Sequence, residues 1–244
     1  MRNISRARDR MRLWGSHMRV RLDLDGRRLL LPLGFLLMML AGSGVASAQA
    51  MGIAAAQAGH EVPQAELSTI LAPPLATPVA GAAQGDVTIV DYFDYNCPVC
   101  RAIEPALRKV VERDPKVRLV HKDWAIFGDA SVYAAYCSFA AAREGKYTQA
   151  HDALIGSKDD LDSKDDVRKV LAGAGFDMKA IDADIARHAK EYRAVLARNE
   201  RESMALGFHG TPGVIVGNQI VQGGGLDYAH LSRLVAQLRK GSTH

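Results

Sequence analysis

Cysteine is scarce in this 244-residue chain, which contains only three, and two of them form the motif Cys97-Pro98-Val99-Cys100. A disulfide across so short a loop adds almost no stability. The chain therefore lacks the cysteine framework of a disulfide-stapled scaffold. A Cys-x-x-Cys pair that is not a structural staple is either redox-active or half of a metal site. No second cysteine pair or methionine-rich stretch lies near enough in sequence to complete such a metal site.

Long apolar runs are also rare, because only the segment from Leu29 to Ala41 is of this kind. It follows an arginine-rich stretch and precedes Ala46-Ser47-Ala48, a pattern typical of a secretory signal peptide. We therefore predict a signal peptide over residues 1–48. The alternative is an uncleaved membrane anchor, although the run is short for a span of about 20 residues.

A strong net charge is absent once the predicted signal peptide is set aside. The first 48 residues hold nine of the 31 basic and three of the 27 acidic residues, which leaves 22 basic and 24 acidic residues. The rest of the chain therefore carries a charge of −2 instead of the +4 of the full sequence. This balance gives no support for nucleic-acid binding.

Internal repeats and low-complexity tracts are absent too, and the residue pattern after the signal peptide divides into four segments. The segments are residues 49–85, 86–128, 129–206 and 207–244. The first is rich in Ala, Pro and Gly, so we predict a flexible lead-in with at most one small helix. Regular structure is then expected to begin at Val87. The second segment has a strand, helix and strand pattern typical of a βαβ unit.

The last two segments differ in their residue patterns. Residues 129–206 show alanine-rich helical patterns without any strand pattern, which predicts an all-helical insertion. Residues 207–244 predict a β-hairpin that turns at Gly217-Asn218, followed by an amphipathic helix. The order of elements predicts an α/β fold.

Cys97 follows a β-branched and aromatic strand and directly precedes a helical pattern, so it is predicted to lie at a helix N-terminus. Unpaired N–H groups and the positive end of the helix dipole stabilise anions there. A thiol in that place ionises more readily, and the thiolate is the nucleophilic form. The local pattern indicates a reversible dithiol/disulfide pair.

Three blocks of sequence occur in an order that resembles the DsbA-like family of periplasmic thiol-disulfide oxidoreductases. They are Asp91–Cys100, Lys122–Gly128 and Gly207–Gly217. The resemblance covers about residues 84–240 and implies a thioredoxin-like fold with an inserted all-helical subdomain.

The resemblance also implies roles for individual residues. Cys97 matches the family's exposed nucleophile, and Cys100 matches the more buried cysteine that resolves the mixed disulfide. Pro212 matches the cis-proline beside the active disulfide, where extended substrates bind. Thr211 is then expected close to Cys97, where it can adjust the stability of the thiolate. Asp91 is expected as a buried general base for Cys100, with an ordinary strand-end aspartate facing water as the alternative.

One departure from the family pattern concerns whether the protein oxidises its substrates or reduces them. The strongly oxidising members carry a histidine between the cysteines, whereas this chain has Pro98 and Val99. Valine supplies neither charge nor a hydrogen bond, so a weaker oxidant is expected. Thr211 before Pro212 is also more similar to the isomerase and reductase branches.

The predicted function is periplasmic thiol-disulfide exchange with exported or unfolded cysteine-containing proteins, as oxidase or as isomerase/reductase. It implies a membrane redox partner, no nucleic acid, and no cofactor beyond the cysteines themselves. No sizeable dimerisation domain is visible, so a monomer is expected. The alternative function is Cu(I) binding by the same two cysteines, because soft thiolates suit that ion.

The remaining candidates have simpler interpretations. Cys137 is expected as a small buried hydrophobe, and His209 as a solvated loop residue or a residue at the rim of the substrate site. His121 and His151 have no visible partners and are expected in core or surface positions. Five aromatic residues are expected mostly in the core, with any exposed ones suited to unfolded chains. They are Tyr92, Phe93, Tyr95, Trp124 and Phe127.

Overall fold

The computed structural model describes residues 61–71, 79–81, 84–222 and 225–241, so the predicted signal peptide lies outside the described residues. All of them lie in the second of two compact units, which begins at Ala56. They contain a five-stranded sheet in the order β1-β3-β2-β4-β5. The strands are β1 (Val79–Gly81), β2 (Val87–Phe93), β3 (Val117–Asp123), β4 (Gly213–Val216) and β5 (Gln219–Gln222).

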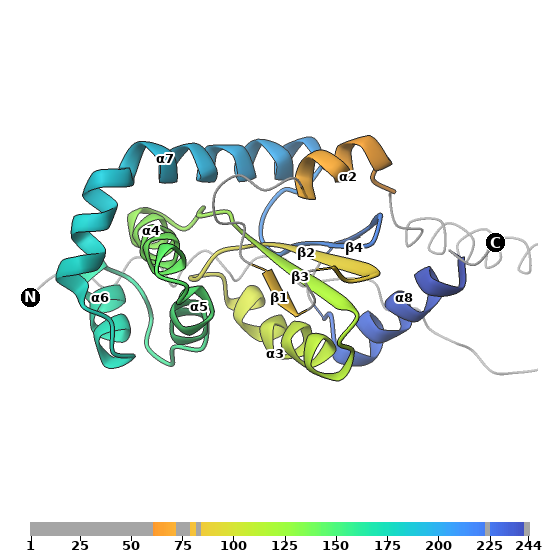
Figure 1. Ribbon diagram of the computed structural model, residues 1–244, viewed down its shortest axis with the longest axis horizontal. Helices are drawn as coiled ribbons and strands as arrows, with labels where there is room; N and C mark the ends of the chain where they lie inside the picture. The colour runs from red at the N-terminus through yellow and green to blue at the C-terminus, as the bar shows by residue number, and fades with distance from the viewer. Residues whose placement is uncertain (1–60, 72–78, 82–83, 223–224, 242–244) are drawn as a thin grey trace, which may run out of the picture. The chain divides into compact units, whose positions relative to one another are not determined.

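The helices lie on both faces of the sheet and at one end of it (Figure 1). They are α2 (Gln64–Leu71), α3 (Pro98–Arg113), α4 (Asp129–Arg143), α5 (Tyr147–Ile155), α6 (Lys164–Gly173), α7 (Met178–Ala205) and α8 (Tyr228–Gly241). Helices α3 and α8 cover one face, while α2 and the C-terminal part of α7 cover the other. The predicted helical insertion is the run from α4 to α7, between β3 and β4. No described helix combines the length and apolarity that a membrane span requires.

The central strand β2 sets the position of the candidate site. It runs parallel to β3 and antiparallel to β4. In this register Asp91 lies opposite His121 on one side and Val214 on the other. Six of the seven β2 residues are buried, as expected for a strand covered by helices on both faces. The carboxyl end of β2 leads directly to the cysteine motif.

Local signals explain where several helices begin. Pro98 occupies the first turn of α3, where its missing N–H costs nothing. Ser163 and Asp166 form a capping box at the start of α6. The Asp227 carboxylate accepts a hydrogen bond of 2.7 Å from the backbone N–H of His230 at the start of α8. The hairpin between β4 and β5 turns at residues 217–218, as predicted.

The expectation that regular structure begins at Val87 is wrong. Strand β1 pairs antiparallel with the edge of β3. Helix α2 buries Leu67 and Ile70 against the face of the sheet that α3 and α8 do not cover. The backbone N–H of Val62 also donates a 2.7 Å hydrogen bond to Asn218 in the hairpin turn. Helix α2 is the small helix that the sequence allowed in this segment, whereas β1 was not predicted. Both elements are short, so packing against the sheet stabilises them more than local propensity does.

The cysteine motif lies where the sheet meets the helical insertion. Cys97 and Cys100 belong to one buried cluster with Phe93, Tyr95 and apolar residues of α4 to α7. A second cluster fills the space between the sheet and α3 and α8, and a third packs α2 against the opposite face. The insertion therefore forms one wall of the site.

Candidate active site

Cys97 is the N-cap residue of α3, as predicted. Its backbone is extended, with φ −76° and ψ 116°, and its Sγ accepts a 3.4 Å hydrogen bond from the backbone N–H of Cys100. Both cysteines are free thiols in this structure. The sulfur thus occupies the place where a helix offers unpaired N–H groups to an anion.

The loop before β4 lies against this sulfur. The Cys97 thiol donates a 3.3 Å hydrogen bond to the backbone carbonyl of Thr211. The Thr211–Pro212 peptide bond is cis, as the family resemblance implied. The buried hydroxyl oxygen of Thr211 has no hydrogen-bond partner among the described residues, so it is free to donate to the sulfur once Cys97 ionises.

The two thiols have opposite pKa shifts. Hydrogen bonds that favour the thiolate, first from the Cys100 thiol and then from Thr211 and the backbone, lower the pKa of Cys97 to about 6. The same hydrogen bond to Cys97, together with burial and the Asp91 charge, raises the pKa of Cys100 far above its ordinary value. Cys97 is therefore the thiolate at neutral pH, and Cys100 keeps its proton.

The expectation that Cys97 is exposed and Cys100 more buried is wrong for the residues as a whole. Each has only 2% of its surface accessible. The Thr211–Pro212 loop covers the Cys97 sulfur, while Pro98 and Val99 at the start of α3 are exposed. Val99 is 38% exposed. The residues between the cysteines, and not the sulfur, thus form most of the exposed surface of the motif.

Asp91 faces inward, as predicted, with 2% of its surface accessible. Burial, followed by the charges of Glu104 and Cys97, raises the pKa of its carboxyl group well above the ordinary value. One carboxylate oxygen has no hydrogen-bond partner among the described residues. The other lies 4.0 Å from Nδ1 of His121. The role of Asp91 as a base for Cys100 stays a prediction.

The exposed surface around the motif is partly apolar. Ile126 and Phe127 are 43% and 52% exposed, whereas the other four aromatic candidates are buried, as expected. A cavity of about 440 Å³ lies beside the motif and contains Pro98 and Phe127 in its wall. Its charged lining consists of three acidic residues and one basic residue, namely Asp129, Asp160, Asp162 and Arg101, and the Arg101 guanidinium donates to the carbonyl oxygens of Tyr95 and Ser157.

Two other candidates take the expected positions. Cys137 is fully buried in α4, and burial raises the pKa of its thiol to about 12, so it is a poor nucleophile at neutral pH. His209 is exposed on the loop before Thr211, beside the buried Phe208. Its contribution to substrate binding stays a prediction.

Asp94, which no sequence signal singles out, organises the loops around the motif. Its buried carboxylate accepts hydrogen bonds of 2.7 to 3.0 Å from four donors. The donors are the backbone N–H groups of Asn96, Ile126 and Phe127 and the hydroxyl of Ser131. Aspartate often caps turns two residues ahead, but the distant donors leave no local signal.

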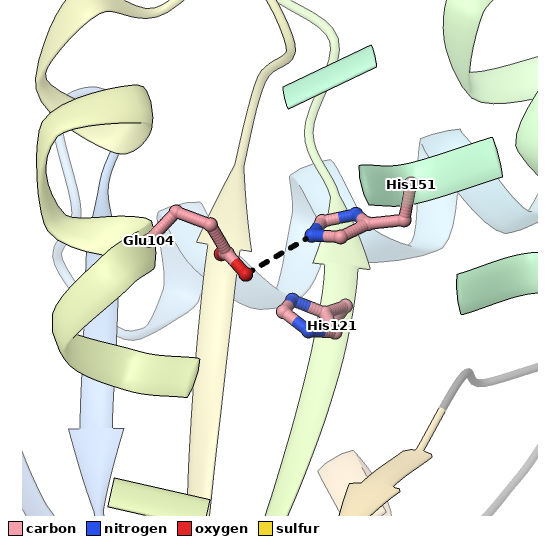
Figure 2. A group of neighbouring side chains, drawn as sticks. All are labelled: Glu104, His121 and His151. Carbon is pink, nitrogen blue, oxygen red and sulfur yellow. Dashed lines mark ion pairs between the residues drawn. The ribbon is translucent and has the colours of Figure 1, made fainter. Parts of the chain in front are cut away.

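His121 and His151 are both buried, so they take the core position, one of the two that were expected. Both lie in the core within reach of Glu104 (Figure 2). The three residues are far apart in the sequence, and the packing of α3 against β3 and α5 brings them together. Among the described residues, no such cluster of three ligand atoms includes Cys97 or Cys100.

A free cysteine pair at a helix N-terminus, facing a cis-proline, defines the dithiol proteins of the thioredoxin class. Residues 88–234 match the DSBA-like thioredoxin domain, and the chain belongs to that family. The predicted family and the predicted thioredoxin-like fold with a helical insertion are both confirmed.

Several solved structures are similar to this chain. A thioredoxin-like oxidoreductase from Silicibacter pomeroyi DSS-3 is 35% identical with a TM-score of 0.66, over 73% of this chain and 99% of that one. The thiol-disulfide exchange protein alpha-DsbA2 from Wolbachia pipientis is 25% identical with a TM-score of 0.65, over 71% and 92%. The catalytic domain of Proteus mirabilis ScsC is 26% identical with a TM-score of 0.60, over 71% and 94%.

Curated relatives include much longer proteins. The Na(+)/H(+) antiporter NhaA 3 of Salinispora tropica is 34% identical over 93 residues, which are 37% of this chain and 14% of the antiporter. The antiporter NhaA 1 of Mycolicibacterium vanbaalenii is 27% identical over 178 residues, or 66% and 26%. The chain therefore spans only a small part of the antiporters that it matches.

Proposed function

We propose that the protein is a periplasmic thiol-disulfide oxidoreductase that exchanges disulfides with exported cysteine-containing proteins through Cys97 and Cys100. The observation that carries this proposal is the free Cys97–Cys100 pair at the N-terminus of α3, with the cis Thr211–Pro212 loop against the Cys97 sulfur. The opposite shifts of the two thiol pKa values agree with it. Membership of the DSBA-like family and the two relatives described as an oxidoreductase and a thiol-disulfide exchange protein support it.

The first step is attack of the Cys97 thiolate on a sulfur of a substrate disulfide. A bond forms between Cys97 Sγ and that sulfur, and the substrate S–S bond breaks. The second substrate sulfur leaves as a thiolate and takes a proton from water. Because Cys97 is mostly ionised at neutral pH, this step needs no separate base.

The second step is attack by Cys100 on the Cys97 sulfur. Cys100 must first lose its proton, which its raised pKa disfavours. Asp91, whose charge contributes to that raised pKa, is the group we assign as the base. The Cys97–Cys100 disulfide then forms, and the substrate leaves as a reduced dithiol. The same steps in reverse oxidise a substrate.

The surface around the motif suits an extended, partly unfolded chain. Val99, Ile126 and Phe127 offer exposed apolar surface, and Phe127 lines the same cavity as Pro98. The cavity beside Pro98 adds the carboxylates of its wall. We infer that segments with apolar and basic residues near the cysteine bind best, because they complement both features.

The pKa of Cys97 also bears on whether the protein oxidises or reduces its substrates. Thiolates at this position have a pKa of about 3.5 in DsbA, a strong oxidant, and about 7 in thioredoxin, a reductant. A value of about 6 places this protein nearer to the reducing end. We therefore propose an isomerase or reductase, kept reduced by a membrane partner, over a pure oxidase.

The decisive experiment measures exchange between the protein and a disulfide-containing peptide. We expect Cys97→Ser to abolish exchange and Cys100→Ser to accumulate a mixed disulfide, because the resolving thiol is gone. Cys137→Ala is the matched control and keeps activity. Exchange that survives in Cys97→Ser would refute the proposal. Export is tested separately, by fusing residues 1–48 to a reporter enzyme that is active only outside the cytoplasm.

A further inference from the structure

A second cluster of chemically active side chains lies in the core, beyond the cysteine pair. Glu104 of α3, His121 of β3 and His151 of α5 point toward one another (Figure 2). All three are at least nine-tenths buried, and one ligand atom from each lies within 4.8 Å of the others. Nε2 of His151 is 3.5 Å from Oε1 of Glu104.

The imidazole nitrogens of this cluster lack ordinary partners. Nε2 of His151 and Nδ1 of His121 are both buried without a hydrogen-bond partner among the described residues. Buried polar atoms are nearly always satisfied, and leaving one unsatisfied costs about 1–3 kcal/mol. Two such atoms beside a carboxylate therefore need an explanation, and a bound cation supplies one.

The other nitrogen of His151 is held in place. Its Nδ1 lies 3.2 Å from the hydroxyl of Tyr95 and 3.3 Å from that of Tyr147. If Nδ1–H donates to these oxygens, the lone pair is on Nε2 and points to Glu104. Metal-binding histidines almost always have a second partner of this kind, which fixes the tautomer and the ring.

The protonation states of the two histidines also suit a ligand set, whereas burial raises the pKa of the Glu104 carboxyl from its ordinary value. Burial lowers the pKa of His121 to about 3 and that of His151 to about 4, so both rings are neutral at pH 7. Neutral imidazole is the form that binds metal ions. The nearest cation, Arg108, is 3.7 Å from Glu104 but is also paired with Asp152. Its charge is thus largely neutralised.

A cavity of about 90 Å³ reaches the three residues. Arg108 and the exposed Glu112 also line it, so it opens toward the surface. The volume exceeds the space that one water molecule occupies, about 30 Å³. The cluster therefore has both an entry path and room for a fourth ligand.

We propose that Glu104, His121 and His151 form a Zn²⁺ site with a water molecule as the fourth ligand. Two histidines and a glutamate are a known ligand set for zinc with an open position. Metal–ligand bonds of about 2.0–2.1 Å put tetrahedral ligand atoms roughly 3.4 Å apart. The Glu104–His151 pair already matches this at 3.5 Å, and small side-chain movements bring in His121.

The test uses purified protein without a histidine tag and with the Cys97–Cys100 disulfide formed, so that no thiolate of the motif can bind metal. Zn²⁺ is titrated calorimetrically, and Co²⁺ is added as a spectroscopic substitute. We expect one Zn²⁺ per chain and a four-coordinate Co²⁺ spectrum without sulfur charge-transfer bands. Absence of stoichiometric binding, or a sulfur-ligand spectrum, would overturn the proposal.

Variants then locate the site. Glu104→Gln and His151→Gln are expected to weaken Zn²⁺ binding at least tenfold, since each removes a ligand. His188→Gln is the matched control, because His188 lies 3.7 Å from Asp184 and 3.5 Å from Glu191 on the surface of α7 and is the competing site. Near-ultraviolet circular dichroism of each metal-free variant confirms folding. Equal loss in the His188 variant, or none in the other two, would refute the assignment.

This inference does not depend on the proposed oxidoreductase activity. If the cysteines cannot form a disulfide, the titration is made on the Cys97→Ser/Cys100→Ser variant, and the proposed function fails alone. If exchange is normal and Zn²⁺ does not bind, the metal site fails alone.

Discussion

The low pKa of Cys97 fixes how the redox potential of the pair depends on pH. Reduction of the disulfide consumes two electrons. Below the pKa of Cys97 it also consumes two protons, one for each sulfur. Above that pKa it consumes one, because Cys97 stays ionised and Cys100 keeps its proton.

The slope of the redox potential against pH follows from this number of protons. For a two-electron couple each proton contributes about 29.6 mV per pH unit. The potential should therefore fall by about 59 mV per pH unit below pH 6 and by about 30 mV per unit above it. A pair with an ordinary thiol pKa of 9.0 would keep the steeper slope through pH 8. At pH 7 the expected thiolate fraction of Cys97 is about nine-tenths.

The assay equilibrates the protein with glutathione buffers from about pH 5 to about pH 8.5, followed by acid quenching, alkylation and gel separation. Thr211→Val, which removes a donor to the thiolate, should move the change of slope to higher pH. Thr88→Val, on β2, is the control and should leave it in place. A slope near 59 mV through pH 8, or a break that Thr211→Val does not move, would refute the reasoning.

Three further predictions concern the surroundings of the pair. Asp91→Asn should slow resolution of the mixed disulfide about a hundredfold with little effect on the first attack, as stopped-flow measurement of each step shows; equal loss in both steps contradicts a role as base. Asp94→Ala should lower the free energy of unfolding by about 3 kcal/mol, because it leaves four donors unpaired, whereas the exposed Asp162→Ala should change it by less than about 0.5 kcal/mol in urea titrations. Because the folded-state pKa of Cys97 is depressed, the stability of the reduced protein should rise from about pH 6 to about pH 9, and thermal melts of the oxidised protein, which lacks this thiol, should show no such rise.

The sequence predicts most of the helices and strands and half of the candidate active site. Periodicity and caps give the helices of the insertion, and the motif residues give Cys97, Cys100 and Pro212. The short β1 leaves no comparable signal, because its stability comes from pairing with the distant strand β3.

The sequence does not predict the buried cluster of Glu104, His121 and His151 for a related reason. Glu104, His121 and His151 have no spacing that marks a metal site, and each has an ordinary helix or strand environment. Their proximity depends on the packing of α3 against β3 and α5, which only tertiary structure defines. The low exposure of Cys97 likewise depends on the Thr211–Pro212 loop, which lies more than 100 residues away in the sequence.

Helix α3 carries both the resolving Cys100 and Glu104, four residues apart on its buried side. Inserting one residue between them would turn Glu104 by about 100° away from His151 while Cys100 stayed in place. Deleting one would do the same in the opposite sense. The length of this four-residue interval is therefore under two independent constraints, so the segment should tolerate substitutions far better than any change in length.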